Sequence, residues 1–288
     1  MASLEPAGGG YHGGVAPAIS VEEVARQALE IARDVSVDEL DALAGADPHL
    51  RIDNLHAGYA QMEVLHGLSL RVGHKQSLCL VGPNGAGKST VLHSIFGFTN
   101  IYSGSVFTER DGVRIDVTSL TPSEKLRSGG IAYILQDNSV FPGMTVEENL
   151  WMGGYLMDQP AEAKRAAEKV FDKYPRLAAR RKHPARVLSG GERRLLEISR
   201  ALVMDPQILL VDEPSIGLEP RFIDAVFDIL GDLQHKEGKT IVIVEQNAKK
   251  GFEFADIGYV MVSGKLALAG RANDLLANPD VSRLFLGG

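Results

Sequence analysis

Hydrophobic and polar positions divide the chain into a short N-terminal part with helical periodicity and a longer body. Residues 1–18 are rich in Gly, Pro and Ala and show no periodic pattern, which is typical of a mobile segment. Between residues 20 and 44, apolar residues recur every three or four positions. Ser-x-x-Glu boxes at Ser20 and Ser36 predict the starts of two helices, and Gly45 predicts a stop. These helices either pack on a flank of the longer body or bind a partner, and we favour packing on the flank.

From residue 50 onward, short alternating segments favour strands. Two of them, 50–56 and 62–72, predict a pair of strands joined by a turn at Ala57, Gly58 and Tyr59. Residues 105–117 predict another hairpin, and residues 257–269 predict a last one that turns at Ser263 and Gly264.

Continuous apolar runs of four to six residues indicate strands that are buried on both faces. They form the apolar part of the predicted strands 76–81, 131–135, 207–212 and 240–244, as LCLV, IAYIL, ILLV and IVIV. Helical patterns fall between them, from about residue 88, over most of 145–204 and over 220–234. Strands that alternate with helices predict an α/β fold with a parallel sheet, into which the helical block 145–204 is inserted.

Composition narrows the class of protein. The 288 residues allow one large domain or two small ones, and 44% hydrophobic residues supply a sizeable core. No apolar run approaches the roughly 18 residues that a membrane-spanning helix needs, and the first residues lack a signal-peptide pattern. The net charge of −7 argues against nucleic acid as a partner. Cys79 is the only cysteine, so an intrachain disulfide is excluded; its apolar neighbours favour a packing role in a reducing compartment.

A glycine-rich loop supplies the first candidate chemistry. Residues 82–89, GPNGAGKS, fit G-x-x-x-x-G-K-[ST] between an expected strand and an expected helix. The glycines allow successive backbone N–H groups to face one centre, and Lys88 adds a positive charge for a phosphate. Ser89 offers a hydroxyl to Mg²⁺, and the helix N-terminus favours an anion. A chance glycine-rich turn is the alternative, and the strand before and the helix after favour nucleotide binding.

Two acids follow another buried strand in ILLVDE, residues 208–213. Asp212 emerges at the carboxyl end of this strand, where open α/β sheets bind ligands. It is suited to a metal's water shell, and Glu213 is suited to orient or deprotonate an attacking water. A solvated acid pair is the alternative, and the apolar strand argues against it.

The segment LSGGE at 188–192 predicts a second anion site. Ser189 and Glu192 form a capping box, which leaves Gly190 and Gly191 unexplained because glycine weakens a first helical turn. Bare backbone at a helix N-terminus binds anions well. Either the chain binds two anions separately, or the LSGGE of one chain faces the GPNGAGKS of another.

Four features follow one another along the chain, namely GPNGAGKST, Gln136, LSGGE and ILLVDEP. Together they resemble the ATPase subunit of ATP-binding cassette transporters, and the resemblance covers about residues 50–288. The resemblance implies a P-loop NTPase with a RecA-like parallel sheet core, an antiparallel β subdomain and a helical subdomain at about 137–205. Residues 1–48 would be an extension and residues 49–288 the ATPase domain. Two ATP, with Mg²⁺, would lie between two cassettes arranged head to tail.

The resemblance also implies a role for each matching residue. Tyr59 would stack on adenine, although alone it could equally be a packing tyrosine. Glu213 would be the catalytic base. The phosphates would be held by Gly82, Pro83, Asn84, Gly85, Ala86, Gly87, Lys88, Ser89 and Thr90. The metal would be held by Ser89, Gln136 and Asp212. The γ-phosphate in the opposite subunit would be met by Ser189, Gly190 and Gly191. Glu192, the last residue of the segment, would belong to the same nucleotide-binding site.

The stretch IVIVEQN departs from the family, which usually has a histidine near this strand end. Gln246 takes the matching position. A glutamine donates hydrogen bonds but carries no charge, so it would sense the γ-phosphate with little effect of pH. Alternatively, Gln246 only caps the following helix.

Four stretches point to one branch of this family, namely VEQNA, VFPGMTVEENL, DEPSIGLEP and ADIGYVMVSGKLALAG. They look like the smaller ATPase of importers for branched-chain and other hydrophobic amino acids. Related cassettes serve urea or short amides. The implied partners are a second cassette, permease subunits that meet residues from Gln136 onward, and a separate substrate-binding protein, at the cytoplasmic face of the membrane. The alternative function is a soluble cassette ATPase in assembly or scaffolding.

Overall fold

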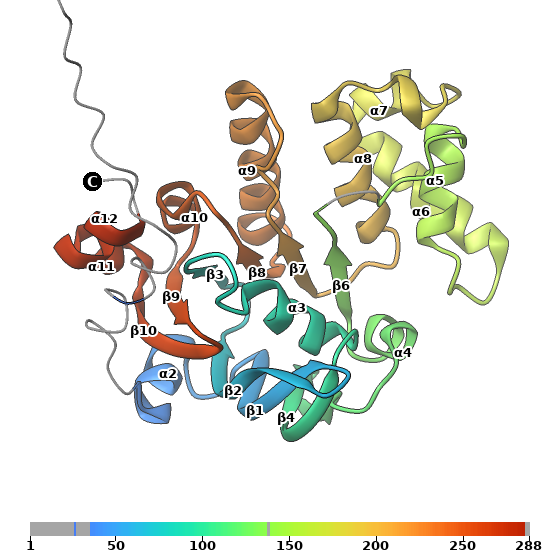
Figure 1. The fold of residues 1–288 in the computed structure, drawn as a ribbon. Coiled ribbons are helices and arrows are strands. Elements are labelled where there is room, and N and C mark those ends of the chain that lie inside the picture. Colours follow the sequence, from blue (N-terminus) through green and yellow to red (C-terminus); the bar gives the residue numbers. More distant parts are fainter. Residues whose placement is uncertain (1–25, 27–34, 137–138, 286–288) are drawn as a thin grey trace, which may run out of the picture.

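Two β-sheets of different kinds organise the chain (Figure 1). The computed structural model describes residue 26, residues 35–136 and residues 139–285. Within these residues, one sheet has four strands in the order β2-β1-β4-β5, and the other has six in the order β10-β9-β3-β8-β7-β6. The predicted α/β class, with a parallel core and an antiparallel subdomain, is confirmed.

The antiparallel sheet consists of β1 (Leu50–Tyr59), β2 (Met62–Val72), β4 (Asn100–Arg110) and β5 (Val113–Asp116). The predicted turn at Ala57, Gly58 and Tyr59 is wrong, because Gly58 pairs with Glu63 and Tyr59 with Met62. Gly58 is needed for close strand approach, since a Cβ there would lie 2.0 Å from the Met62 carbonyl oxygen.

The core of the second sheet consists of parallel strands, namely β3 (Ser77–Val81), β6 (Ile131–Ile134), β7 (Ile208–Asp212) and β8 (Thr240–Val244). Every residue of β3, β7 and β8 is buried, Cys79 included, as their continuous apolar patterns predict for a sheet covered on both faces. β9 (Ile257–Val262) and β10 (Lys265–Arg271) extend the sheet as the predicted hairpin.

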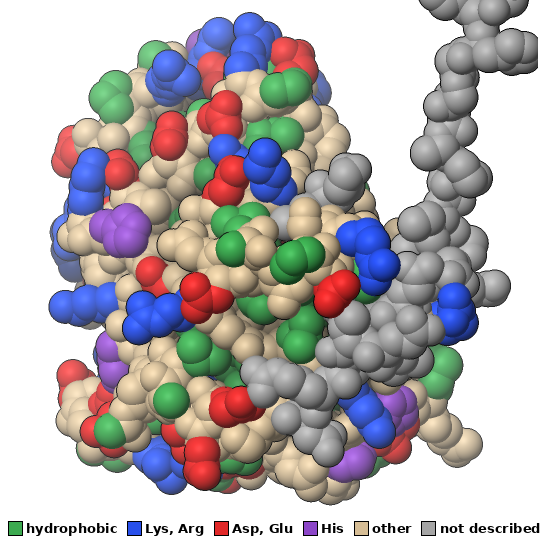
Figure 2. All heavy atoms as spheres, turned by 90° about the vertical axis from the view of Figure 1, so that its left-hand side faces the viewer, with side chains coloured by type: hydrophobic (Ala, Val, Ile, Leu, Met, Phe, Trp, Pro, Cys, Tyr) green, Lys and Arg blue, Asp and Glu red, His purple; other side chains and the backbone are tan. Residues whose placement is uncertain are grey.

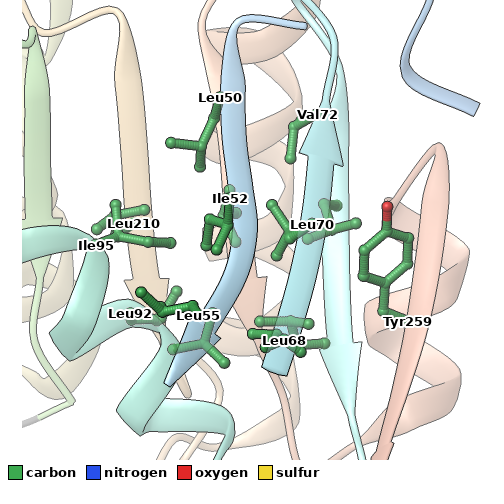
Figure 3. Packing of buried hydrophobic residues seen from close by; sticks show 14 of the residues in the cluster. Leu50, Ile52, Leu55, Leu68, Leu70, Val72, Leu92, Ile95, Leu210 and Tyr259 are labelled. Atoms are coloured by element: carbon green, nitrogen blue, oxygen red, sulfur yellow. The ribbon is translucent and has the colours of Figure 1, made fainter. Parts of the chain in front are cut away.

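Helices cover both faces of the parallel sheet. α3 (Lys88–Phe96) lies between it and the antiparallel sheet, and Figure 3 shows Leu92 and Ile95 of α3 beside Leu55 of β1 and Leu210 of β7. On the other face, α9 (Pro220–His235) and α10 (Ala248–Phe254) share an apolar cluster with the strands. Three shorter helices complete these layers, namely α4 (Pro122–Arg127), α11 (Ala272–Ala277) and α12 (Pro279–Phe285).

A separate helical group lies between β6 and β7 in the chain and stands apart from the sheets in Figure 1. Its helices are α5 (Val146–Gly153), α6 (Pro160–Lys173), α7 (Pro175–Ala179) and α8 (Gly190–Leu202). They share their own apolar cluster, to which Leu150, Phe171 and Leu196 belong. This group therefore has a core of its own and is joined to the sheets at the ends of two neighbouring strands.

The N-terminal helix α2 (Val37–Ala44) packs on the flank formed by β2 and β10. It has the predicted capping box, and its Leu40 is buried in the same cluster as β1 and β2. Arg71 of β2 is fully buried, and its Nε donates to Asp41 of α2 at 2.8 Å. The other predicted helix, which begins near Ser20, lies outside the described residues.

The surface carries charges of both signs. On the face seen in Figure 2, Lys and Arg side chains are interspersed with Asp and Glu side chains. Among the residues that the structure describes, no helix combines the length and the apolar character needed to cross a membrane.

Candidate functional site

Three strand ends bring the predicted site residues to one edge of the parallel sheet. β8 lies between β3 and β7, so the residues that follow these strands are neighbours. The glycine-rich loop follows β3, Asp212 ends β7, and Glu245 follows β8. The carboxyl edge of an open α/β sheet is the usual position for a ligand.

The glycine-rich loop curls as the sequence predicts. Gly85 and Gly87 have positive φ angles of 82° and 96°, in the left-handed region that favours glycine. A Cβ at Gly82 would lie 2.2 Å from the Met261 carbonyl oxygen, so this position excludes any side chain. Gly87 directly precedes α3, which places the helix N-terminus at the loop.

Lys88 is held inside its own loop. Its Nζ donates to the carbonyl oxygens of Gly82 at 2.9 Å and Pro83 at 3.1 Å. Burial lowers the pKa of Lys88, and the carboxylates of Glu213 and Asp212 oppose this effect. A buried ammonium that is held by two neutral carbonyl oxygens is suited to exchange them for the charged oxygens of a phosphate.

Asp212 is 4% exposed, and each of its carboxylate oxygens accepts one hydrogen bond. Ser89 Oγ donates to Oδ1 at 3.1 Å, and the Tyr133 hydroxyl donates to Oδ2 at 2.8 Å. Hydroxyl and carboxylate oxygens are the hard donors that Mg²⁺ prefers, so Ser89 and Asp212 fit the predicted metal. Gln136, the third predicted ligand, donates from its amide nitrogen to Glu213, and its role as a metal ligand stays a prediction.

Glu213 has a strained backbone and a clamped side chain. Its φ is +42°, which costs a residue with a side chain on the order of 1–3 kcal/mol. Its N–H donates to the Val244 carbonyl oxygen at 2.9 Å. Gln136 Nε2 donates to one carboxylate oxygen at 3.0 Å, and Gln246 Nε2 donates to both at 3.2 Å. Two uncharged amides therefore fix the carboxylate that the sequence predicts as a base.

The three polar residues after β8 have three different partners. Gln246 contacts Glu213, and Asn247 is the cap of α10, where its Oδ1 accepts from the Lys250 N–H at 3.1 Å. The alternative that Gln246 caps this helix is therefore wrong. Whether Gln246 senses a γ-phosphate stays a prediction.

Glu245, which sequence reasoning left without a role, contacts the segment after Glu213. It is 1% exposed, and its carboxylate accepts from the Ser215 N–H at 3.0 Å and the Ser215 hydroxyl at 2.9 Å. Burial raises the pKa of Glu245, and these hydrogen bonds oppose the effect. The sequence signal for this contact was an acid directly after a buried apolar strand, where the acid would be buried as well.

The predicted signature segment begins α8. Ser189 is the cap: its Oγ accepts from the Glu192 N–H at 3.3 Å, and Glu192 accepts from the Ser189 N–H at 3.0 Å. Gly191 leaves room for Phe222 of α9, since a Cβ there would lie 2.5 Å from the Phe222 ring. Gly190 is exposed and carries no such constraint. Among the described residues, no hydrogen bond joins the signature segment to residues 82–90.

Arg194 is a further site residue that sequence reasoning missed. It is buried in α8, pairs with Glu197 at 2.7 Å, and donates to the carbonyl oxygens of Leu135 at 2.9 Å and Asp212 at 3.4 Å. The helix of the signature segment is thus tied to the backbone at the ends of β6 and β7. Its pattern in the sequence, an arginine within an amphipathic helix, does not indicate this contact.

Tyr59 lies at the end of β1 and is 38% exposed. Its hydroxyl shares a hydrogen bond with Nδ1 of His93 in α3, and the two rings meet edge to face. Burial lowers the pKa of His93. The exposed ring remains free for a stacking ligand, and its contact with adenine stays a prediction.

Comparisons with known proteins add the family context. The family model for ABC transporters matches residues 65–216. A probable branched-chain amino acid transport ATP-binding protein LivF of Archaeoglobus fulgidus is 39% identical, over 83% of this chain and 98% of the relative. The high-affinity branched-chain amino acid transport ATP-binding protein BraG of Pseudomonas aeruginosa is 38% identical, over 83% of this chain and 100% of the relative. A solved nucleotide-free ATP-binding cassette from an ABC transporter superposes with a TM-score of 0.72 at 28% identity, over 84% of this chain and 100% of the other.

Proposed function

Because this chain belongs to the ABC transporter family of ATP-binding proteins, we propose that it is the ATP-hydrolysing subunit of an importer for branched-chain or other hydrophobic amino acids. The assignment of ATP hydrolysis rests on one observation: the amides of Gln136 and Gln246 hold the carboxylate of Glu213, beside Lys88 and Asp212 at one sheet edge. The proposed class of substrate rests on the similarity to LivF and BraG.

The residues divide the chemistry of ATP hydrolysis among them. Lys88 exchanges its loop carbonyls for phosphate oxygens, and the backbone of residues 82–90 surrounds the anion. Ser89 and Asp212 would hold Mg²⁺, which would supply positive charge to the phosphates of ATP when it is bound. Glu213 accepts the proton of the attacking water, and the amides of Gln136 and Gln246 keep its carboxylate in place.

The second half of each ATP site comes from another cassette. Ser189 and Gly190 are exposed at the N-terminus of α8, where backbone donors favour an anion. Their exposure, without a hydrogen bond to residues 82–90 among the described residues, supports a head-to-tail pair in which each signature segment meets the partner's loop. Closure of the pair would draw its free energy from γ-phosphate contacts made only in the closed state.

A groove beside the helical group is the proposed contact for a permease subunit. It has a volume of about 310 Å³ and lies between β6 and α5. Tyr155, on its rim, is 76% exposed, and Phe141 is 44% exposed. Exposed aromatic side chains around a groove are typical of an interaction site, and Phe141 belongs to the stretch that begins at Gln136. The chain would then work at the cytoplasmic face of the membrane, beside a permease and a separate substrate-binding protein.

Reconstitution tests this function. The chain is co-expressed with the permease, second cassette and binding protein encoded next to it, and uptake of labelled leucine into proteoliposomes is measured. ATP-dependent uptake that the Lys88→Ala variant lacks supports the proposal. Uptake of urea or short amides in place of leucine would correct the substrate class. ATP hydrolysis by a chain that never co-purifies with permease subunits would favour the soluble assembly or scaffolding role.

A further inference from the structure

Tyr133 lies behind the proposed metal site and belongs to none of the predicted motifs. It is on β6, it is half-buried at the groove described above, and its ring contacts three aromatic side chains. Ring centroids lie 5.7 Å away for His93, 5.6 Å for Phe96 and 6.0 Å for Phe98. These ring contacts and the hydrogen bond to Asp212 together set the direction of the hydroxyl.

The two oxygens of Asp212 have different partners. Oδ1 accepts from Ser89 at 3.1 Å, on the side of the glycine-rich loop, and Oδ2 accepts from Tyr133 at 2.8 Å. A carboxylate rotates easily about its last bond, since that torsion has a broad energy minimum. The hydrogen bond from Tyr133 removes this freedom and leaves Oδ1 turned toward Ser89.

The Tyr133 hydroxyl donates this hydrogen bond, and Oδ2 of Asp212 accepts it. The bond therefore holds one oxygen of the carboxylate and leaves the other for a second partner.

We propose that Tyr133 is the positioning residue for Asp212: by holding Oδ2, it presents Oδ1, together with the Ser89 hydroxyl, to the Mg²⁺ that accompanies ATP. This inference rests on the proposed function, because it needs a nucleotide-bound metal. It predicts that loss of the hydroxyl weakens metal binding more than nucleotide binding.

The test compares Tyr133→Phe with a matched control. The phenylalanine keeps the ring contacts and removes only the hydroxyl. Tyr259→Phe is the control, because the Tyr259 hydroxyl also donates a hydrogen bond, to the Arg71 carbonyl oxygen at 3.2 Å, and Arg71 is not a site residue. Tyr259 belongs to the buried core shown in Figure 3. Mn²⁺ affinity of the ATP complex is measured by electron paramagnetic resonance, and ATP affinity is measured separately by calorimetry in EDTA.

For Tyr133→Phe, we expect about a tenfold loss of Mn²⁺ affinity, as for one hydrogen bond to a charged group. ATP affinity in EDTA stays within about twofold of wild type, the metal concentration for half-maximal hydrolysis rises, and kcat at saturating metal changes little. Equal Mn²⁺ affinities for the Tyr133 and Tyr259 variants would overturn the inference, as would an equal loss of ATP affinity in EDTA. Wild-type protein that binds no ATP would instead overturn the proposed function.

Discussion

Replacement of Gln246 by alanine tests whether the amide clamp on Glu213 contributes to hydrolysis. The change removes both contacts of Gln246 Nε2 with the carboxylate, each 3.2 Å long, and leaves Gln136 as the remaining amide at 3.0 Å. Hydrogen bonds to charged groups contribute about 1.5–3 kcal/mol. We use the lower end, because both distances are long and Gln246 is exposed.

A loss of about 1.5 kcal/mol in the transition state corresponds to roughly a tenfold lower kcat. Gln246 makes no contact with the glycine-rich loop in its described hydrogen bonds, so ATP affinity is expected to stay within about twofold. Single-turnover phosphate release gives the rate of the chemical step, and fluorescence titration with a nucleotide analogue gives the affinity.

Asn247→Ala is the control for this experiment. Asn247 is the neighbour of Gln246 but caps α10, so its loss should lower the free energy of unfolding by about 1 kcal/mol and leave kcat unchanged. If Gln246→Ala hydrolyses ATP at the wild-type rate, the clamp is incidental to catalysis. If ATP affinity falls as much as kcat, Gln246 binds the nucleotide and does not act through Glu213.

Three further outcomes are expected. Lys88→Ala should abolish nucleotide binding, because the buried ammonium is the main positive charge at the loop; calorimetry that still gives micromolar affinity would contradict this. Glu213→Gln should keep ATP bound but lower turnover by about 10²-fold or more, and normal phosphate release would remove Glu213 from its role. Glu245→Gln tests pH dependence: since the folded pKa of Glu245 is raised above its ordinary 4.5, the stability from this group is present below that value and is lost as pH rises through the folded pKa. The variant's melting temperature relative to wild type should therefore be higher at pH 7.5 than at pH 4.5, and an unchanged difference would contradict the raised pKa.

The sequence predicted the fold where burial dictates the pattern. β3, β7 and β8 are buried on both faces, so their apolar runs are continuous and their ends are well marked. The turn in the first hairpin was placed too early, because Gly58 suggested a turn by its residue type. Its role is a close approach to Met62 on the paired strand, and only the register shows that.

The candidate site was predictable where one segment carries the chemistry, as in the glycine-rich loop. Contacts between residues of different segments could not be predicted. Glu213 meets Gln136 and Gln246 because β7 lies between β6 and β8, and this strand order is absent from any local pattern. Tyr133 and Arg194 look like ordinary core and helix residues, and only the packing of β6 and α8 against β7 brings them to Asp212.

Burial of Cys79 makes the chain well suited to chemical labelling. The only thiol in the sequence lies inside β3, packed so closely on α10 that a Cβ at Gly251 would be 2.5 Å from its sulfur. Burial also raises its pKa, which suppresses the reactive thiolate. A cysteine introduced at an exposed position away from the site, such as Val113 of β5, would thus be the single thiol open to maleimide probes. Spin labels at that position would report the separation of two cassettes without prior removal of a native thiol.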